Sequence, residues 1–234
     1  MGRVPPNDPT GPVKELSAKR ELTLGLLVYV LYLLVRKLVL ERDGRERARR
    51  NAERIVAVER RLGVQVEPAL QRTLLRLPRL VHGLNVGYGI FNVGLSMGWL
   101  VVLHRRGDPG YRSLRRACLA AHVGAQPVFL LFPTAPPREL EGFVDTLSEV
   151  SGFDLEHPLL VRFYNPVAAM PSLHVAFAWV TAAALAERSS SAGVKAAAYG
   201  YPALVSLVVA GTGNHYVLDA VAGAALGAAA RRLV

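Results

Sequence analysis

The chain has 234 residues, of which 51% are hydrophobic, and its formal net charge is +10 at pH 7. The apolar residues are gathered into long blocks rather than spread along the chain as in a soluble domain, which points to a membrane protein. The positive charge does not indicate nucleic-acid binding, because the Lys and Arg residues flank the apolar blocks without an aromatic-rich basic module between them. We therefore expect a bilayer with anionic lipids as a partner, and no nucleic acid.

The N-terminal segment, residues 1–20, is polar and rich in proline, which predicts a mobile tail outside the fold. Nothing resembling a cleavage site follows the first apolar block, so no signal peptide is expected. Cys118 is the only cysteine, which excludes an internal disulfide and a cysteine-based metal site. The sequence does not indicate an oligomeric state.

The apolar blocks predict membrane-spanning helices. Residues 80–103 and 117–137 contain no Asp, Glu, Lys or Arg, and each is about as long as the ~20-residue helix that crosses a bilayer. Residues 22–35 are also uncharged, and this block extends to residue 40 past two basic residues whose long stems reach back to the headgroup level. Each of these three blocks predicts one span.

The C-terminal part of the chain predicts three more spans. Residues 163–186 are uncharged, but two prolines, the second of them Pro171, indicate that the regular helix begins only near Ser172. Residues 194–230 are too long for one crossing and are interrupted by the turn formers at 211–214, so we expect two short antiparallel helices. A partly re-entrant hairpin is the alternative for this last pair.

The segment between the first two spans, residues 41–79, is rich in arginine. Ala52, Ile55, Val56 and Leu62 fall at roughly helical spacing within it, as does Val58, which is typical of an amphipathic helix lying on the membrane surface. A solvated charged face without further role is the alternative. The predicted fold is therefore all-α: a six-span transmembrane bundle over residues 21–234 with one interfacial helix.

The distribution of basic residues predicts how the bundle is oriented. With six spans, the tail, residues 104–116, residues 187–195 and the C-terminus share one side, and their Lys and Arg residues predict that this side is cytoplasmic. The more acidic segment 138–162 and the uncharged turn at 211–214 lie on the opposite, extracytoplasmic side, which the Arg-rich segment would share. We expect a multi-pass protein of the cell membrane with both termini in the cytoplasm.

Candidate catalytic and phosphate-binding residues lie near the extracytoplasmic ends of the last spans. In the sequence Met170-Pro171-Ser172-Leu173-His174, the proline frees backbone amides at a helix start, Ser172 can cap that helix, and the positive end of the dipole attracts an anion. This arrangement predicts a phosphate-binding site. The alternative is that Ser172 is only a cap and His174 a buried structural histidine.

A second group follows the turn at 211–214. His215 and Asp219 are four residues apart and lie on one face of a helix, so their side chains can meet. A hydrogen bond from one ring nitrogen to Asp219 would fix the tautomer of His215 and make its other nitrogen a competent nucleophile toward phosphorus. The alternative is a structural ion pair between helices.

A third feature, Pro136-Pro137-Arg138, follows the third span. The two prolines would hold the guanidinium of Arg138 near the membrane surface, where it can bind phosphate oxygens with two hydrogen bonds. An ordinary interfacial anchor is the alternative interpretation of this residue.

Together these features resemble the type 2 phosphatidic acid phosphatase superfamily, and within it the branch similar to fungal inositol phosphorylceramide synthase. Residues 165–176 and 213–223 carry the resemblance, and residues 136–138 are a looser match to the family's first motif. The resemblance implies that His215 attacks phosphorus with support from Asp219, and that His174 protonates the leaving alkoxide. It implies catalysis without a metal or other cofactor.

The resemblance also implies a set of phosphate-binding residues. Ser172 and Arg138 bind phosphate oxygens, with Leu173 and Asn214 as further positions in the two motifs. Two residues are additional candidates for phosphate or headgroup contacts: Arg162 and Tyr216.

The sequence departs from the phosphatase branch at two cation positions. Leu131 occupies the place of the usual Lys in the first motif, and Val208-Val209 stand where that branch has Ser-Arg. This pattern favours the phosphotransferase-like branch, and it leaves open whether Arg162 or an arginine of residues 41–79 supplies the missing charge.

The predicted function is that of a membrane lipid phosphatase or phosphotransferase. Such an enzyme cleaves a lipid phosphoester through a phosphohistidine and passes the phosphoryl group to water or to an alcohol such as inositol. The competing interpretation is a non-enzymatic transporter or scaffold with buried structural histidines. A vanadate-dependent peroxidase is disfavoured because those resemble soluble helical proteins.

Overall fold

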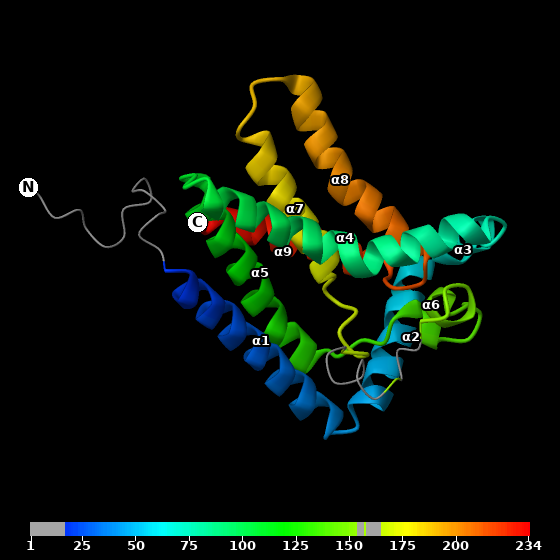
Figure 1. Cartoon of the computed structure of the whole chain (residues 1–234). Coiled ribbons are helices and arrows are strands. Elements are labelled where there is room, and N and C mark those ends of the chain that lie inside the picture. Colours follow the sequence, from blue (N-terminus) through cyan, green and yellow to red (C-terminus); the bar gives the residue numbers. More distant parts are fainter. Residues whose placement is uncertain (1–16, 154–156, 158–164) are drawn as a thin grey trace, which may run out of the picture.

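The computed structural model describes residues 17–153, 157 and 165–234 (Figure 1). The described part consists of helices and connecting loops, with one isolated β-bridge between Thr134 and Ala168. The predicted all-α class is therefore confirmed. The elements, in chain order, are α1 (Ala18–Leu40), α2 (Gly44–Leu62), α3 (Glu67–Leu74), α4 (Pro78–Arg105), α5 (Gly110–Leu131), the 3-10 helix η2 (Pro137–Glu139), α6 (Thr146–Glu149), α7 (Leu173–Ala186), α8 (Ala192–Gly211) and α9 (Val217–Arg232).

Several helix boundaries follow the sequence signals. Helix α4 covers the predicted block 80–103, and α1 covers 22–40 but begins at Ala18, inside the predicted tail, of which residues 1–16 lie outside the described residues. Helix α7 begins directly after Ser172, whose hydroxyl accepts a hydrogen bond from the amide of Val175 at 3.4 Å. Ser172 is therefore the N-cap, as its position after a proline predicts.

Helix α5 is shifted relative to the predicted block 117–137. It starts seven residues earlier, because Tyr111 and Leu114 continue its buried face, and Arg115 is paired with Glu21 and lies over the Tyr111 ring. It ends at Leu131, two residues before Pro133, since a proline disfavours helical backbone in the residue before it. The uncharged stretch marks the apolar part of this helix rather than its ends.

The predicted break at 211–214 separates α8 from α9. Gly213 has a φ of +74°, a left-handed conformation that glycine adopts without strain, and the chain turns there. Helices α8 and α9 diverge from this turn, and α7 packs against both (Figure 1). The residues of α7 that face its neighbours are mostly alanines, so the three helix backbones come close together.

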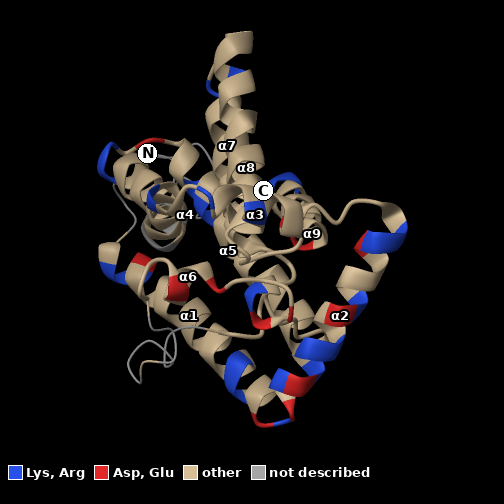
Figure 2. Cartoon of the chain, turned by 90° about the vertical axis from the view of Figure 1, so that its right-hand side faces the viewer, with Lys and Arg blue, Asp and Glu red and all other residues tan. Residues whose placement is uncertain are grey.

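The Arg-rich segment 41–79 forms two helices, α2 and α3, rather than one. Gly63 ends α2 with a left-handed φ of +68°. The buried face of α2 includes Ala52 and Ile55, as the spacing predicted, but Val58 and Leu62 are 43% and 62% exposed. Figure 2 shows charged residues along most of α2 and few along the middle of α1.

Ion pairs gather several chain segments at one end of the molecule. The segments are the start of α1, the α4–α5 connection, the α7–α8 connection and the end of α9. The pairs are Glu21–Arg115, Asp108–Arg188 and Glu187–Arg231. These are the segments that the sequence placed together on one side.

Hydrogen bonds gather the remaining connections at the other end. The side chain of Gln71 in α3 bonds both the N–H and the C=O of Val144, at 3.0 and 2.9 Å. The amide of Arg138 donates to the carbonyl of Gly213 at 2.9 Å. Consequently α4, α5, α7, α8 and α9 each run between these two groups of connections.

Two of the described helices, α1 and α8, are long and apolar enough to cross a membrane by length and composition alone. Their apolar side chains are largely uncovered: Leu22 and Leu26 of α1 are 74% and 62% exposed, and Leu204 and Leu207 of α8 are 59% and 58% exposed. Exposed apolar surfaces of this kind are typical of regions that contact lipid or another protein.

The close contact of α7 and α9 yields a stability prediction. A Cβ at Gly227 would lie 2.6 Å from the carbonyl oxygen of Ala176, so we expect Gly227→Ala to destabilise the protein by about 1–3 kcal/mol. Gly200→Ala in α8 is the matched control, since no other described residue outside its own helix turn comes within 4 Å of a Cβ built there. Thermal melting in detergent checks both variants. Equal melting temperatures for Gly227→Ala and wild type would contradict the packing.

Candidate active site

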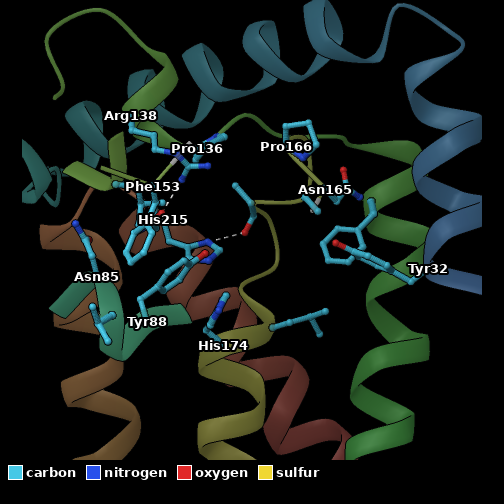
Figure 3. Close-up of a pocket in the computed structure, with 17 residues that line it drawn as sticks. Tyr32, Asn85, Tyr88, Pro136, Arg138, Phe153, Asn165, Pro166, His174 and His215 are labelled. Atoms are coloured by element: carbon cyan, nitrogen blue, oxygen red, sulfur yellow. Dashed lines mark hydrogen bonds between the residues drawn. The ribbon is translucent and has the colours of Figure 1, made fainter. Parts of the chain in front are cut away.

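A cavity of about 450 Å³ opens at the end of the molecule where α3, η2, α6 and the α8–α9 turn meet. Two histidines, His174 and His215, face it together with Arg138 (Figure 3). Its volume lies in the range of small-molecule sites. The other lining residues are Tyr32, Asn85, Val86, Tyr88, Phe129, Pro136, Leu147, Phe153, Asn165, Pro166, Ala168, Ala169, Leu173 and Asn214.

His215 lies in the turn before α9 and is 4% exposed. Its Nδ1 is 2.9 Å from the carbonyl oxygen of Ala169, and because a carbonyl only accepts, Nδ1 carries the hydrogen. The Nε2 atom is buried and has no hydrogen-bond partner among the described residues. The hydrogen bond to Ala169 therefore leaves the lone pair on Nε2, the ring nitrogen available for attack.

The electrostatic surroundings also favour the neutral ring. Burial lowers the pKa of His215, because a charged imidazolium would lose its hydration; the bond to the Ala169 carbonyl opposes this shift, and the guanidinium of Arg138 adds to it. A neutral imidazole is the form that can act as a nucleophile.

Asp219 lies beside His215, as the four-residue spacing predicts. Its Oδ2 is 3.4 Å from Nδ1 of His215, farther than the carbonyl of Ala169, and accepts a hydrogen bond from the amide of Tyr216 at 3.0 Å. The acceptor that fixes the tautomer is thus the Ala169 carbonyl in this structure. Asp219 contributes a nearby carboxyl group and caps α9.

His174, in the first turn of α7, faces the same cavity. Its ring lies against the ring of Tyr88 with 4.3 Å between centroids, and it meets the ring of His215 edge-on with 5.6 Å between centroids. A phosphoryl group bound at Nε2 of His215 would lie within the space that His174 also borders. His174 is therefore placed to exchange a proton with a group leaving phosphorus.

Arg138 is held at the cavity wall. It is 7% exposed, and its Nη1 donates to Oδ1 of Asn214 at 2.6 Å, while Nε lies 3.8 Å from a carboxylate oxygen of Asp145. Asn214 in turn donates to the hydroxyl of Thr212 at 2.8 Å. This chain of contacts fixes the guanidinium next to His215, where it can bind phosphate oxygens.

The remaining predicted site residues do not all line the cavity. Leu173 lines the cavity, whereas Ser172 is fully buried, caps α7 and is not among the lining residues. Tyr216 is also fully buried and packs in the core behind the site. Arg162 lies outside the described residues.

Sequence reasoning assigned no role to several cavity residues. Asn85 donates to the carbonyl of Thr146 at 2.7 Å, and Tyr88 packs on His174. Asn165 accepts a hydrogen bond from the amide of Val167 at 3.2 Å. A polar amide within the apolar block 80–103 is a signal that could have identified Asn85, since such a residue needs a partner.

Comparison with known proteins gives one match. A family model described as the PAP2 superfamily matches residues 53–233, most of the chain. The chain belongs to the PAP2 superfamily. No curated protein and no solved structure matches it. Membership in the PAP2 superfamily indicates a phosphatase-type enzyme that acts on phosphate esters. The matched region contains α7, α8, α9 and every residue that lines the cavity except Tyr32.

Proposed function

We propose that this PAP2 protein is a membrane enzyme that cleaves a lipid phosphoester through a phosphohistidine on His215. The observation that carries the proposal is the geometry of His215: Nδ1 donates to the Ala169 carbonyl, Nε2 has no hydrogen-bond partner among the described residues, and the residue lines a cavity that Arg138 and His174 also line. Nucleophile, phosphate-binding cation and proton donor converge on one space.

In the first half of the proposed reaction, Nε2 of His215 bonds to phosphorus and the bond from phosphorus to the lipid oxygen breaks. The leaving alkoxide takes a proton from His174. Arg138 binds the phosphate oxygens, whose negative charge is shared among the equatorial positions. No step of this scheme uses a metal ion.

In the second half, water or an alcohol gives its proton to His174 while its oxygen attacks phosphorus. The bond from Nε2 to phosphorus breaks, and His215 returns to its neutral form. Water gives hydrolysis, and an alcohol such as inositol gives transfer. The replacement of two usual cations by Leu131 and Val208-Val209 supports a place in the branch similar to inositol phosphorylceramide synthase.

We further propose six membrane spans, formed by α1, α4, α5, α7, α8 and α9. The exposed apolar surfaces of α1 and α8 support this topology, as does the alternation of α4, α5, α7, α8 and α9 between the two groups of connections. Helices α2 and α3 would lie at the interface near the site, where the arginines of α2 can contact anionic headgroups. The termini would be cytoplasmic and the site extracytoplasmic.

The chemistry is tested with a lipid panel on purified protein. We expect turnover of at least one of phosphatidic acid, a polyprenyl pyrophosphate and phosphatidylinositol, with inositol or diacylglycerol supplied as acceptors, and a phosphohistidine that survives an alkaline quench. His215→Ala should lower kcat at least about 1000-fold, as loss of a nucleophile does. His104→Gln, at the other end of α4, is the matched control. Equal turnover by wild type and His215→Ala would exclude the mechanism.

The role of His174 is tested through the leaving group. His174→Ala should slow release of a lipid alcohol about 100-fold or more, the usual contribution of a general acid. Release of 4-nitrophenolate, which leaves without needing a proton, should decrease much less. Similar losses on both substrates would contradict the assignment of His174 as proton donor.

The orientation is tested with reporter fusions in cells. A reporter that is active only in the cytoplasm should be active after the C-terminus and inactive when the chain is truncated after Leu75, because one span precedes that point. The reverse pattern would place the site in the cytoplasm.

A further inference from the structure

The start of α9, next to His215, is bound by three carboxyl groups from three helices. The amide of Tyr216 donates to Asp219 at 3.0 Å, that of Val217 donates to Glu67 of α3 at 2.6 Å, and that of Leu218 donates to Glu59 of α2 at 2.7 Å. The first amides of a helix have no partners within the helix. Here α2 and α3 supply two of the acceptors.

All three carboxyl groups are fully buried. Glu59, Glu67 and Asp219 are 0% exposed, and on each the second oxygen has no N–H or O–H partner among the described residues. Glu67 lies close enough to Glu59 to raise the pKa of that carboxyl group.

Neither Glu59 nor Glu67 lines the cavity, so neither touches the substrate in the proposed mechanism. Both are separated from α9 by about 150 residues of chain, yet each binds an amide within three positions of His215. A buried acid costs free energy, since its charge loses hydration or its proton must be retained. Two such acids on one helix start require an explanation beyond packing.

We propose that Glu59 and Glu67 are positioning residues for His215: they hold the first turn of α9 and thereby fix the imidazole against the Ala169 carbonyl. The inference rests on the proposed function of His215 as nucleophile. It gives the segment 41–79 a part in catalysis, through its buried acids rather than through its arginines.

Geometry gives the first reason. The ring of His215 is held between the Ala169 carbonyl and Asp219, and the residue that follows it starts α9. A displacement of this helix start would move Nε2 away from the phosphorus position, and a misplacement of about 1 Å can reduce the rate about 100-fold.

Electrostatics gives the second reason. The free amides of a helix N-terminus carry partial positive charge, which would oppose the positive charge that the imidazole gains when Nε2 bonds to phosphorus. Carboxyl groups on the amides of Val217 and Leu218 offset that charge. The described residues contain no group of three or more His, Cys, Asp or Glu arranged to hold a metal ion, so the cluster is not explained as a cation site.

Burial gives Glu59 a pH dependence. It raises the pKa of Glu59 to about 8, the bond from Leu218 opposes this shift, and the charges of Glu67 and Asp219 add to it. The other titratable groups at this helix start are Tyr216, which the charge of Glu139 also affects, and His215, which the charge of Arg138 affects. As the pH rises through about 8, Glu59 loses its proton and gains a charge next to Glu67, and the repulsion weakens the hold of α2 and α3 on the start of α9.

The first test compares three substitutions with 4-nitrophenyl phosphate as the probe. Glu67→Ala should lower kcat about 10- to 100-fold with KM nearly unchanged, because the residue does not touch the substrate. Glu67→Gln keeps an oxygen acceptor for Val217 but loses the charge, so its kcat should lie between those of Glu67→Ala and wild type. Glu53→Ala, an exposed acid on α2, is the matched control and should match wild type.

The second test uses Glu59→Gln, which cannot lose a proton but can still accept from Leu218 and donate to Glu67. At neutral pH its kcat should lie within about threefold of wild type. Its alkaline decline in kcat should move up by about one pH unit or more, as expected for strongly interacting groups. If Glu59 acted only as a structural anchor, the alkaline decline in kcat would occur at the same pH in Glu59→Gln as in wild type.

The outcomes separate this inference from the proposed function. Turnover that is the same in wild type and His215→Ala overturns both. Turnover that depends on His215, together with an unchanged kcat in Glu67→Ala, overturns the positioning role alone. If Glu67→Ala does not fold, the pH profile of Glu59→Gln decides, and an unshifted alkaline limb overturns the inference.

Discussion

The imidazole of His215 donates its Nδ1–H to the carbonyl of Ala169, and much of the fold serves to keep these two groups 2.9 Å apart. On one side, the peptide of Ala169 is held because its amide donates to the carbonyl of Thr134 at 3.0 Å, directly after α5. On the other side, His215 is held because the turn before it bonds back to Val209 and α9 starts directly behind it. The reactive nitrogen is thus defined by contacts among α5, α7, α8 and α9.

The two ends of the molecule differ in how they hold the chain. One end is joined by ion pairs between charged side chains, several of them exposed, which contribute little each and tolerate variation. The other end is joined by buried hydrogen bonds such as Asn51 to the Pro133 carbonyl at 2.8 Å, each of which leaves an unsatisfied group if broken. The site lies at the end that is held by buried hydrogen bonds, which restrict the positions of the residues more than exposed ion pairs do. Close backbone packing of α7 with α9 connects the two ends.

Local signals made part of this structure predictable from the sequence. Pro171 and Ser172 marked the start of α7, glycines marked the turn after α8, and the spacing of His215 and Asp219 brought their side chains together, because each depends on residues a few positions apart. The ends of α5 were missed because its first turns are amphipathic. Glu59 and Glu67 were missed because their partners are backbone amides about 150 residues away, which no local pattern reports.

Charge is distributed across His215 in a way that matches phosphoryl transfer. Arg138 lines the cavity, where negative charge would develop on the phosphate oxygens in the proposed mechanism, and carboxyl groups bind the first amides of α9, next to the ring that would gain positive charge. Both sets are buried and already fixed by hydrogen bonds, so little reorganisation is needed when the charges separate. The resemblance places Leu131 and Val208-Val209 where the phosphatase branch has cations, so in the proposed mechanism Arg138 is the guanidinium that the described residues bring to the cavity.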